Sequence, residues 1–452
     1  MATNAVKALV KDAQRRVLDM IFRAGEPIVL VDSPPGAGKT SLIQDVTATG
    51  VHHVGLKIGI CAPKNEQAFE IVRRLMEIDP DVPLEMLLSN KTILPGDLEG
   101  YVQAGRIHRV GNPEALRRGA GVVVGTVDKF NIEIPSFPQK YFDVLICEEV
   151  YQVPFAKFSP LPVIAQQILM VGDPGQLPPY IKSDTSSFEG GAIKPHWPAP
   201  KQLLAMYPEL KNAVVKLPVT WRLPQDTVDL IQPAFYPDLP FRSAHSGADR
   251  SLVLGASGLR SPIDRALDKL ASGESIVCLV APPRASNLEE FDLELAELSA
   301  AVIERLLERI PSWDSNRPLG PADFGVVDPH VASCEHVRSR LRRASIGGET
   351  MVETPEIWQG LQRPVMVAKH PLSGVPRLSQ FELDPGRWCV MLSRHQLGCV
   401  IVTRDGVGEA LEGHLHDSGE RPGGAEDRIW QGWRAHLTLW RELKRLDRLI
   451  KL

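Results

Sequence analysis

The stretch Pro27-Ile28-Val29-Leu30-Val31-Asp32-Ser33-Pro34-Pro35-Gly36-Ala37-Gly38-Lys39-Thr40 decides how this chain of 452 residues is interpreted. Its apolar run predicts a buried strand, a Gly/Pro turn follows, and a helix is expected from Ser41 onward. Small residues in such a turn let successive backbone N–H groups converge on a phosphate, and the helix N-terminus adds a partial positive charge. The spacing before Lys39-Thr40 therefore predicts a phosphate-binding loop.

The loop also predicts its ligands, ATP and Mg²⁺. The backbone of Pro35, Gly36, Ala37 and Gly38 would line the phosphates. Lys39 is expected to bridge the β- and γ-phosphates, and the Thr40 hydroxyl to ligate Mg²⁺. Ser33 stands where the GxxxxGKT pattern has glycine, a small residue and hence a mild change.

An acidic pair follows another apolar run, Phe142 to Cys147. Side chains at the carboxyl end of a parallel strand point into the ligand crevice. We expect Glu148 to hold the metal and Glu149 to orient and deprotonate the attacking water. The segment Gly172-Asp173-Pro174-Gly175-Gln176-Leu177-Pro178-Pro179 follows the next apolar run, and its Gln176 is placed to hydrogen-bond the γ-phosphate.

Helical and strand-like stretches alternate along the chain, which predicts an α/β fold of parallel sheets with crossover helices. The pattern restarts near residue 275, so two tandem α/β domains are expected, over residues 1–224 and 225–417. Residues 79–120 are interpreted as a short insertion with room for a hairpin near 84–110, and residues 180–212 as a surface loop. Residues 418–452 are interpreted as a Gly/Pro-rich linker, 418–425, and a final basic amphipathic helix that runs to the end.

Composition and charge limit the binding partners and the cellular compartment that we expect. Lys and Arg total 51 against 55 Asp and Glu, a net charge of −4, so any nucleic-acid groove must be locally basic. Six cysteines without a CxxC pair indicate reduced core thiols. We expect no signal peptide, no membrane span and a cytoplasmic location.

These motifs, in this order, resemble superfamily 1 helicases over roughly residues 5–405, and GDPGQLPP resembles the 1B branch that includes the Upf-like and Dna-two-like enzymes. The resemblance implies two RecA-like domains. It also implies an ATP-hydrolysing enzyme that moves 5′ to 3′ on single-stranded DNA or RNA, with DNA slightly favoured, and that unwinds or remodels its substrate.

The resemblance assigns further residues by position. For the nucleotide, Gln14 would read adenine, Trp221 would stack on it, Gly360 and Gln362 would lie at the ribose, and Arg222 and Arg394 would reach the transferring phosphate. For the strand, the implied contacts are Pro63, Lys64, Asn65, Thr126, Pro329, His330 and Thr354. The implied catalytic set is Lys39, Glu149, Gln176, Arg222 and Arg394.

Two departures keep other interpretations open. Glu148 stands where the family has Asp, and Gln362 where it has Glu. A hydrolysis-impaired, ATP-gated clamp or scaffold is therefore the alternative, and a P-loop kinase of a small metabolite is a more distant one. The helix over residues 426–452, rich in Arg, Lys and Trp, has three alternative roles. It would contact a nucleic-acid strand, dock on the second domain or bind a protein partner.

Overall fold

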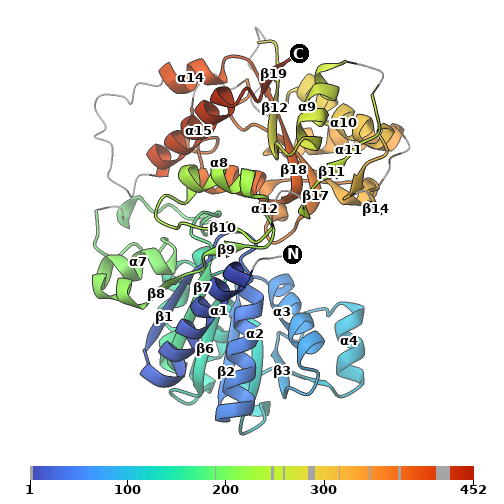
Figure 1. Ribbon diagram of the computed structural model, residues 1–452. Helices are drawn as coiled ribbons and strands as arrows, with labels where there is room; N and C mark the ends of the chain where they lie inside the picture. Colours follow the sequence, from blue (N-terminus) through green and yellow to red (C-terminus); the bar gives the residue numbers. More distant parts are fainter. Residues whose placement is uncertain are drawn as a thin grey trace. The chain divides into compact units, whose positions relative to one another are not determined.

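The computed structural model describes residues 4–452 except 189, 246–248, 258–259, 284–290, 315, 345, 347, 375–377 and 414–427. The predicted linker 418–425 lies outside the described residues. The chain divides into two compact units (Figure 1). The N-terminal unit comprises residues 4–174 and 178–218, and the C-terminal unit comprises residues 219–452 together with 175–177. Each unit is described by itself.

The N-terminal unit is built on an eight-stranded sheet with the order β4-β3-β5-β2-β6-β7-β1-β8, in which all neighbours are parallel. Its strands are β1 (Ile28–Asp32), β2 (Lys57–Ala62), β3 (Leu84–Leu87), β4 (Ile107–Val110), β5 (Gly121–Thr126), β6 (Phe142–Glu148), β7 (Ala165–Gly172) and β8 (Val214–Lys216). Its α-helices are α1 (Asn4–Asp19), α2 (Lys39–Ala48), α3 (Asn65–Ile78), α4 (Gly96–Gln103), α5 (Val127–Glu133), α6 (Phe155–Phe158) and α7 (Ala199–Met206).

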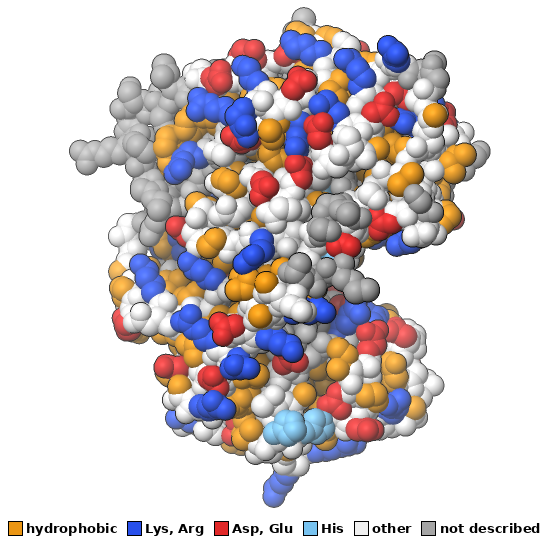
Figure 2. Space-filling view, in the orientation of Figure 1, with side chains coloured by type: hydrophobic (Ala, Val, Ile, Leu, Met, Phe, Trp, Pro, Cys, Tyr) orange, Lys and Arg blue, Asp and Glu red, His pale blue; other side chains and the backbone are white. Residues whose placement is uncertain are grey.

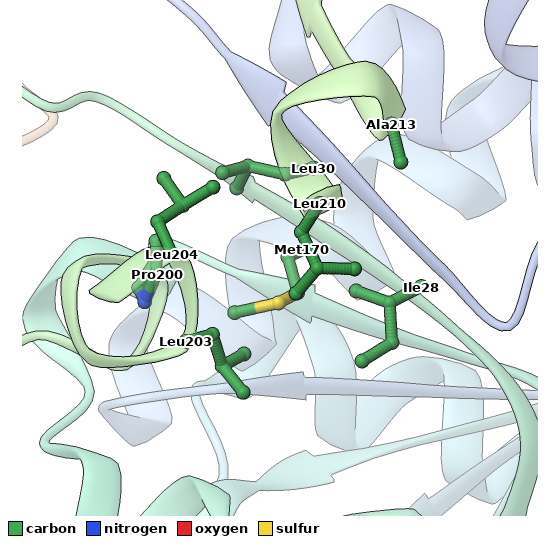
Figure 3. Close-up of a pocket in the computed structure, with 8 residues that line it drawn as sticks. All are labelled: Ile28, Leu30, Met170, Pro200, Leu203, Leu204, Leu210 and Ala213. Atoms are coloured by element: carbon green, nitrogen blue, oxygen red, sulfur yellow. The ribbon is translucent and has the colours of Figure 1, made fainter. Parts of the chain in front are cut away.

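Apolar clusters pack on this sheet because its central strands are apolar on both faces, as parallel strands between helices require. One cluster includes Val17 of α1 and Ile43 of α2, and the other includes Phe130 and Phe158. Figure 3 shows a small apolar pocket in the second region, where Leu203 and Leu204 of α7 approach Ile28, Leu30 and Met170. Both faces of the sheet are thereby buried, and side chains at its carboxyl edge follow directly from buried strands.

Residues 79–120 do not form a hairpin. β3 and β4 run parallel and are joined through α4, so the segment extends the main sheet by a helical crossover. The expectation of a hairpin was wrong because the strands are only four residues long and are separated by helix-forming sequence. Residues 180–212 are also not wholly a loop, since they contain α7.

The C-terminal unit is built on a six-stranded parallel sheet with the order β16-β15-β17-β18-β12-β19. These strands are β12 (Ile276–Ala281), β15 (Phe324–Val327), β16 (Met351–Glu353), β17 (Arg363–Lys369), β18 (His395–Arg404) and β19 (Leu449–Lys451). Short strands form two small sheets, namely β9 (Val219–Thr220) with β10 (Arg242–Ser243), and β11 (Leu252–Val253) with β13 (Ser312–Trp313) and β14 (Arg317–Pro318). Its α-helices are α8 (Gln225–Phe235), α9 (Pro262–Ala271), α10 (Leu293–Glu308), α11 (Val331–Arg343), α12 (Pro355–Trp358), α13 (Pro385–Leu392), α14 (Val407–Gly413) and α15 (Arg428–Arg445).

The sequence predicts a final helix that runs to the end of the chain, and this prediction is wrong. α15 stops at Arg445, and β19 then pairs in parallel with β12 at the edge of the sheet. α15 packs on α8 and α13, with Trp440 and Leu443 buried in the core of its own unit. Docking on the second domain, one of the three roles expected for this helix, is therefore what the structure shows.

The predicted fold class is confirmed, since both units are α/β with parallel sheets, as expected of tandem RecA-like domains, and α15 is the C-terminal helix. All six cysteines are buried and none forms a disulfide, as expected of core thiols. Within the described residues, we find no helix with the length and apolar character needed to cross a lipid bilayer.

Candidate functional site

The predicted phosphate loop lies between the carboxyl end of β1 and the start of α2. Gly36 and Gly38 have φ values of 71° and 85°, a left-handed conformation that glycine adopts without strain. Ser33 is buried, and its backbone N–H donates to the Gly172 carbonyl at 2.9 Å, which ties the entry of the loop to the end of β7. The turn therefore opens directly onto the N-terminus of a ten-residue helix.

Lys39 is held by an acidic residue from another strand. Its Nζ lies 2.7 Å from Oε1 of Glu149, which follows the end of β6. Burial lowers the pKa of Lys39, but the carboxylates of Glu149 and Asp173 outweigh burial and raise it overall. Glu149 itself has φ 49°, a conformation that costs free energy in a non-glycine residue and that often occurs at functional sites.

Glu148 is the more deeply buried member of the acidic pair, with 8% of its surface exposed. Burial, and then the charge of Glu149, raise the pKa of Glu148 to about 8, while Lys39 opposes the shift. A cation bound beside this carboxyl group would favour its ionised form and displace the proton. The predicted role of Glu148 as a metal ligand stays a prediction.

Several polar residues around this pair were not assigned from the sequence. The Gln152 amide donates to Glu149 Oε2 at 3.5 Å and accepts from Gln67 Nε2 at 3.4 Å. Asp173 is buried within the GDPGQ segment and acts on the pKa of Lys39. Both residues could have been identified from the sequence. Gln152 comes three residues after the acidic pair, and Asp173 lies inside the GDPGQLPP segment.

Tyr151 and Asp32 form a contact that had no such signal. The Tyr151 hydroxyl donates to Asp32 Oδ1 at 2.6 Å, across 119 positions of sequence. Burial raises the pKa of Asp32, and the Tyr151 hydrogen bond opposes the rise. Asp32 is the last residue of β1, so this bond links the residue before the phosphate loop to the segment after the acidic pair.

Gln14, predicted to read adenine, lies on α1 beside the helix that follows the loop. Its Nε2 donates to Asp45 Oδ2 on α2 at 2.9 Å. This contact places Gln14 in the same unit as Lys39, next to the helix that begins there.

The residues of the N-terminal unit that are predicted to bind the nucleic acid lie side by side. Ala62 and Thr126 are partners in the register of β2 and β5, so Pro63, Lys64 and Asn65 leave the sheet next to Thr126. The Thr126 hydroxyl accepts from the Lys129 backbone N–H at 3.1 Å and so caps α5. Lys64 is exposed at this edge.

The residues of the C-terminal unit that are predicted to bind the nucleic acid have the same arrangement. Val327 and Glu353 are partners in the register of β15 and β16, so Pro329 and His330 leave the sheet near Thr354. The His330 ring stacks on Phe381, with ring centroids 5.6 Å apart. In each unit, the residues predicted to bind the nucleic acid therefore follow the carboxyl ends of neighbouring β-strands.

The C-terminal unit also brings together predicted nucleotide residues. Arg222 Nε donates to Gln362 Oε1 at 2.8 Å, and its Nη1 donates to the Ser393 carbonyl at 3.2 Å. Arg394 follows Ser393, is 1% exposed, and donates from Nε to the Val390 carbonyl at 3.2 Å. Nearby in sequence, Gly360 has φ 83°, and the Trp221 carbonyl accepts from Arg250 at 2.6 Å.

Gln176 belongs to the C-terminal unit although β7, which precedes it, does not. A Cβ added at Gly175 would overlap the Tyr236 ring, and one added at Gly386 would overlap the Gln176 carbonyl. Lys39, Thr40, Glu148 and Glu149 thus lie in one unit, whereas Gln176, Arg222, Gln362 and Arg394 lie in the other. A single site built from both sets stays a prediction.

Fold and geometry together define a class: a parallel α/β protein whose sheet edge carries a glycine turn, a partly buried lysine and two carboxylates. No protein-family model matches the chain, and no curated protein matches it.

Solved structures do align with the chain, and helicases are among them. The PRRSV helicase is 12% identical, with a TM-score of 0.39 over 87% of this chain and 54% of that one. Arterivirus nonstructural protein 10 (helicase) in complex with DNA is 14% identical, with a TM-score of 0.41 over 87% and 62%. The DUF1998 helicase MrfA bound to DNA and AMPPNP is 11% identical, with a TM-score of 0.39 over 90% and 51%. This chain thus spans half to three fifths of the length of these proteins, and a similarity this distant says nothing of activity.

Proposed function

We propose that this chain is a nucleic-acid-dependent ATPase of the superfamily 1 helicase type, in the 1B branch, which translocates 5′ to 3′ on single-stranded DNA or RNA. The observation that carries the proposal is the 2.7 Å contact between Lys39 and Glu149 beside the glycine turn. A lysine and a carboxylate at the carboxyl edge of a parallel sheet, next to a helix N-terminus, are the groups that phosphoryl transfer needs.

The residues present fit ATP with Mg²⁺. The turn at Gly36 and Gly38 leaves backbone N–H groups free of Cβ obstruction, and Thr40 and Glu148 are the groups that would hold the cation. Bound Mg²⁺ would supply neutralisation of the phosphate charge. Lys39 would exchange its contact with Glu149 for the phosphates, which frees Glu149 to accept the proton of the attacking water.

Arg222 and Arg394 would complete the site from the C-terminal unit. Arg222 is already oriented by Gln362, and Arg394 by the Val390 carbonyl. Guanidinium groups that reach a transferring phosphoryl group accelerate hydrolysis by about 10³–10⁵ in well-studied NTPases. In this proposal the two units close on ATP and reopen after hydrolysis.

The predicted strand contacts at the edges of both sheets support a track for a single strand. Pro63 to Asn65 lie beside Thr126 in one unit, and His330 lies near Thr354 in the other. The face in view in Figure 2 mixes basic and acidic side chains, in keeping with the net charge of −4. Binding would thus depend on local contacts rather than on a general positive field.

Steady-state ATP hydrolysis tests the proposal directly. The full chain is assayed with Mg²⁺, alone and with single-stranded oligo-dT or oligo-U, beside Lys39→Ala and Glu149→Gln. We expect stimulation by at least one strand and a loss of about 10²-fold or more in both variants, because each removes a group that acts on the reacting phosphate.

The alternative functions predict different results from the same assay. Strand binding that depends on ATP, without turnover, would favour the clamp, in which Glu148 and Gln362 no longer support hydrolysis. ATP turnover that ignores both strands and requires a small acceptor would identify a kinase instead.

A further inference from the structure

Trp197 holds two lysines on its ring in the N-terminal unit. The Nζ atoms of Lys194 and Lys201 lie 4.2 Å and 3.9 Å from the centroid of the indole. Such distances are well inside the roughly 6 Å limit for a cation–π interaction. Both ammonium groups are thus held at one ring, which is only partly buried.

The segment that carries these residues is fixed by buried hydrogen bonds. Gln202, which is fully buried, accepts from the Lys194 backbone N–H at 2.9 Å and donates to the Ala192 carbonyl at 3.1 Å. The carbonyls of Pro195 and Trp197 accept from Ala156 and Phe155 of α6 at 2.9 and 2.8 Å. The lysine pair is therefore presented by an ordered backbone, which lowers the entropy lost on binding.

Contacts within the N-terminal unit connect the segment that carries the pair to a residue predicted to bind the nucleic acid. α6 is joined to α5 by an ion pair between Lys157 and Asp128 at 2.7 Å, and by a hydrogen bond from Asn131 to the Lys157 carbonyl. α5 is capped by Thr126, one of the predicted strand contacts. A continuous path of contacts thus leads from Thr126 through α5 and α6 to Trp197, within one unit.

We propose that Lys194 and Lys201, oriented by Trp197, form a phosphate-binding site that extends the single-strand track of the N-terminal unit beyond Thr126. The proposal rests on the proposed function, since it needs a strand to bind. The ligand is the phosphodiester backbone, shared by DNA and RNA. The two ammonium groups attract the negatively charged phosphates of the backbone.

The experiment measures binding of labelled single-stranded dT20 and U20 to the full chain by fluorescence anisotropy, over a series of salt concentrations. The test variant is Lys194→Ala with Lys201→Ala. The matched control is Lys140→Asn with Lys211→Ala, which removes the same charge from exposed lysines that precede β6 and β8 at the amino ends of these strands. Asn is used at position 140 because the backbone there has φ 53°.

The test variant should lower the slope of log K against log salt by about 1.4, because each phosphate contact to a single strand contributes about 0.7. At 100 mM salt its affinity should fall on the order of ten-fold, whereas the control variant should match wild type. Circular dichroism and the melting temperature check that both variants are folded.

Each other outcome has a definite meaning. If wild type binds strand and the test variant keeps the wild-type slope, this site is wrong and the proposed function stands. If wild type binds neither oligonucleotide, the proposed function fails and the site with it. If poly-glutamate displaces the oligonucleotide as well as unlabelled strand does, the lysines serve an acidic peptide and the proposal is overturned.

Discussion

At the scale of single residues, the contact between Tyr151 and Asp32 predicts a measurable stability effect. Tyr151→Phe removes the donor to a carboxyl group whose pKa is already raised by burial. Leaving a largely buried acceptor without its partner costs about 1–3 kcal/mol. Urea denaturation should show this loss for Tyr151→Phe and none for Tyr207→Phe, because Tyr207 is 46% exposed. Equal midpoints for the two variants would contradict the assigned role.

The same contact marks the limit of what sequence can predict about the site. Lys39 and Glu149 were assigned from short motifs because phosphate chemistry demands those groups at those spacings. No sequence motif includes Tyr151, Asp32 or the Lys194–Trp197–Lys201 group. Their contacts depend on how segments distant in sequence pack together. Gln152 lies between these cases, close enough to the acidic pair to have been considered.

At the scale of elements, the docking of α15 depends on one glycine. A Cβ at Gly432 would overlap the backbone carbonyl of Leu383, which cannot move as a flexible side chain would. Gly432→Ala should therefore destabilise the C-terminal unit by at least about 2 kcal/mol, despite the better helix propensity of alanine.

Gly100→Ala is the matched control for this prediction. Gly100 lies within α4 and has open space around its Cβ position, so alanine there should be neutral or stabilise by about 0.5–1 kcal/mol. Thermal melts of both variants decide the matter, and a Gly432→Ala protein as stable as wild type would show that α15 is not tightly packed.

Continuous apolar runs between turn residues were correctly predicted as strands, whereas three of the short strands were not predicted. β1, β2, β5, β6 and β7 are apolar runs between turn residues, and each is a strand. β3, β4 and β19 have only three or four residues each, too few for a period to stand out. Whether such a segment pairs as a strand is decided by the free edge of the sheet beside it.

At the scale of the whole molecule, buried histidines predict how stability depends on pH. Burial lowers the pKa of His395 and His436 to about 3, and that of His370 well below its usual range, all from an ordinary value of 6.5. Between these values the unfolded chain binds more protons than the folded one, so stability is full above pH 6.5 and falls as the pH drops below it. Each histidine contributes up to about 1.4 kcal/mol per pH unit in that window.

Tryptophan fluorescence can measure this effect in urea titrations at pH 7.5, 6.0 and 5.0. Seven of the eight tryptophans belong to residues 219–452, the unit that contains the three histidines. Glu148 acts in the opposite direction, because its raised pKa favours the folded state at lower pH, but it lies in the other unit. A midpoint that stays constant from pH 7.5 to 5.0 would refute the prediction, and His436→Gln should reduce the pH dependence.

The assignment of Gly175–Leu177 to the C-terminal unit has a practical consequence for dividing the gene. Leu177 is part of the apolar cluster that contains Leu223 and Tyr236, and Gly175 lies against Tyr236. A fragment that starts at Val219 would lack that leucine and carry a hole in its core. Its companion, ending at Pro218, would expose the same leucine to water and so be prone to aggregate. Anyone who wishes to study one unit alone would do better to graft residues 175–177 back by a short linker than to cut the chain once.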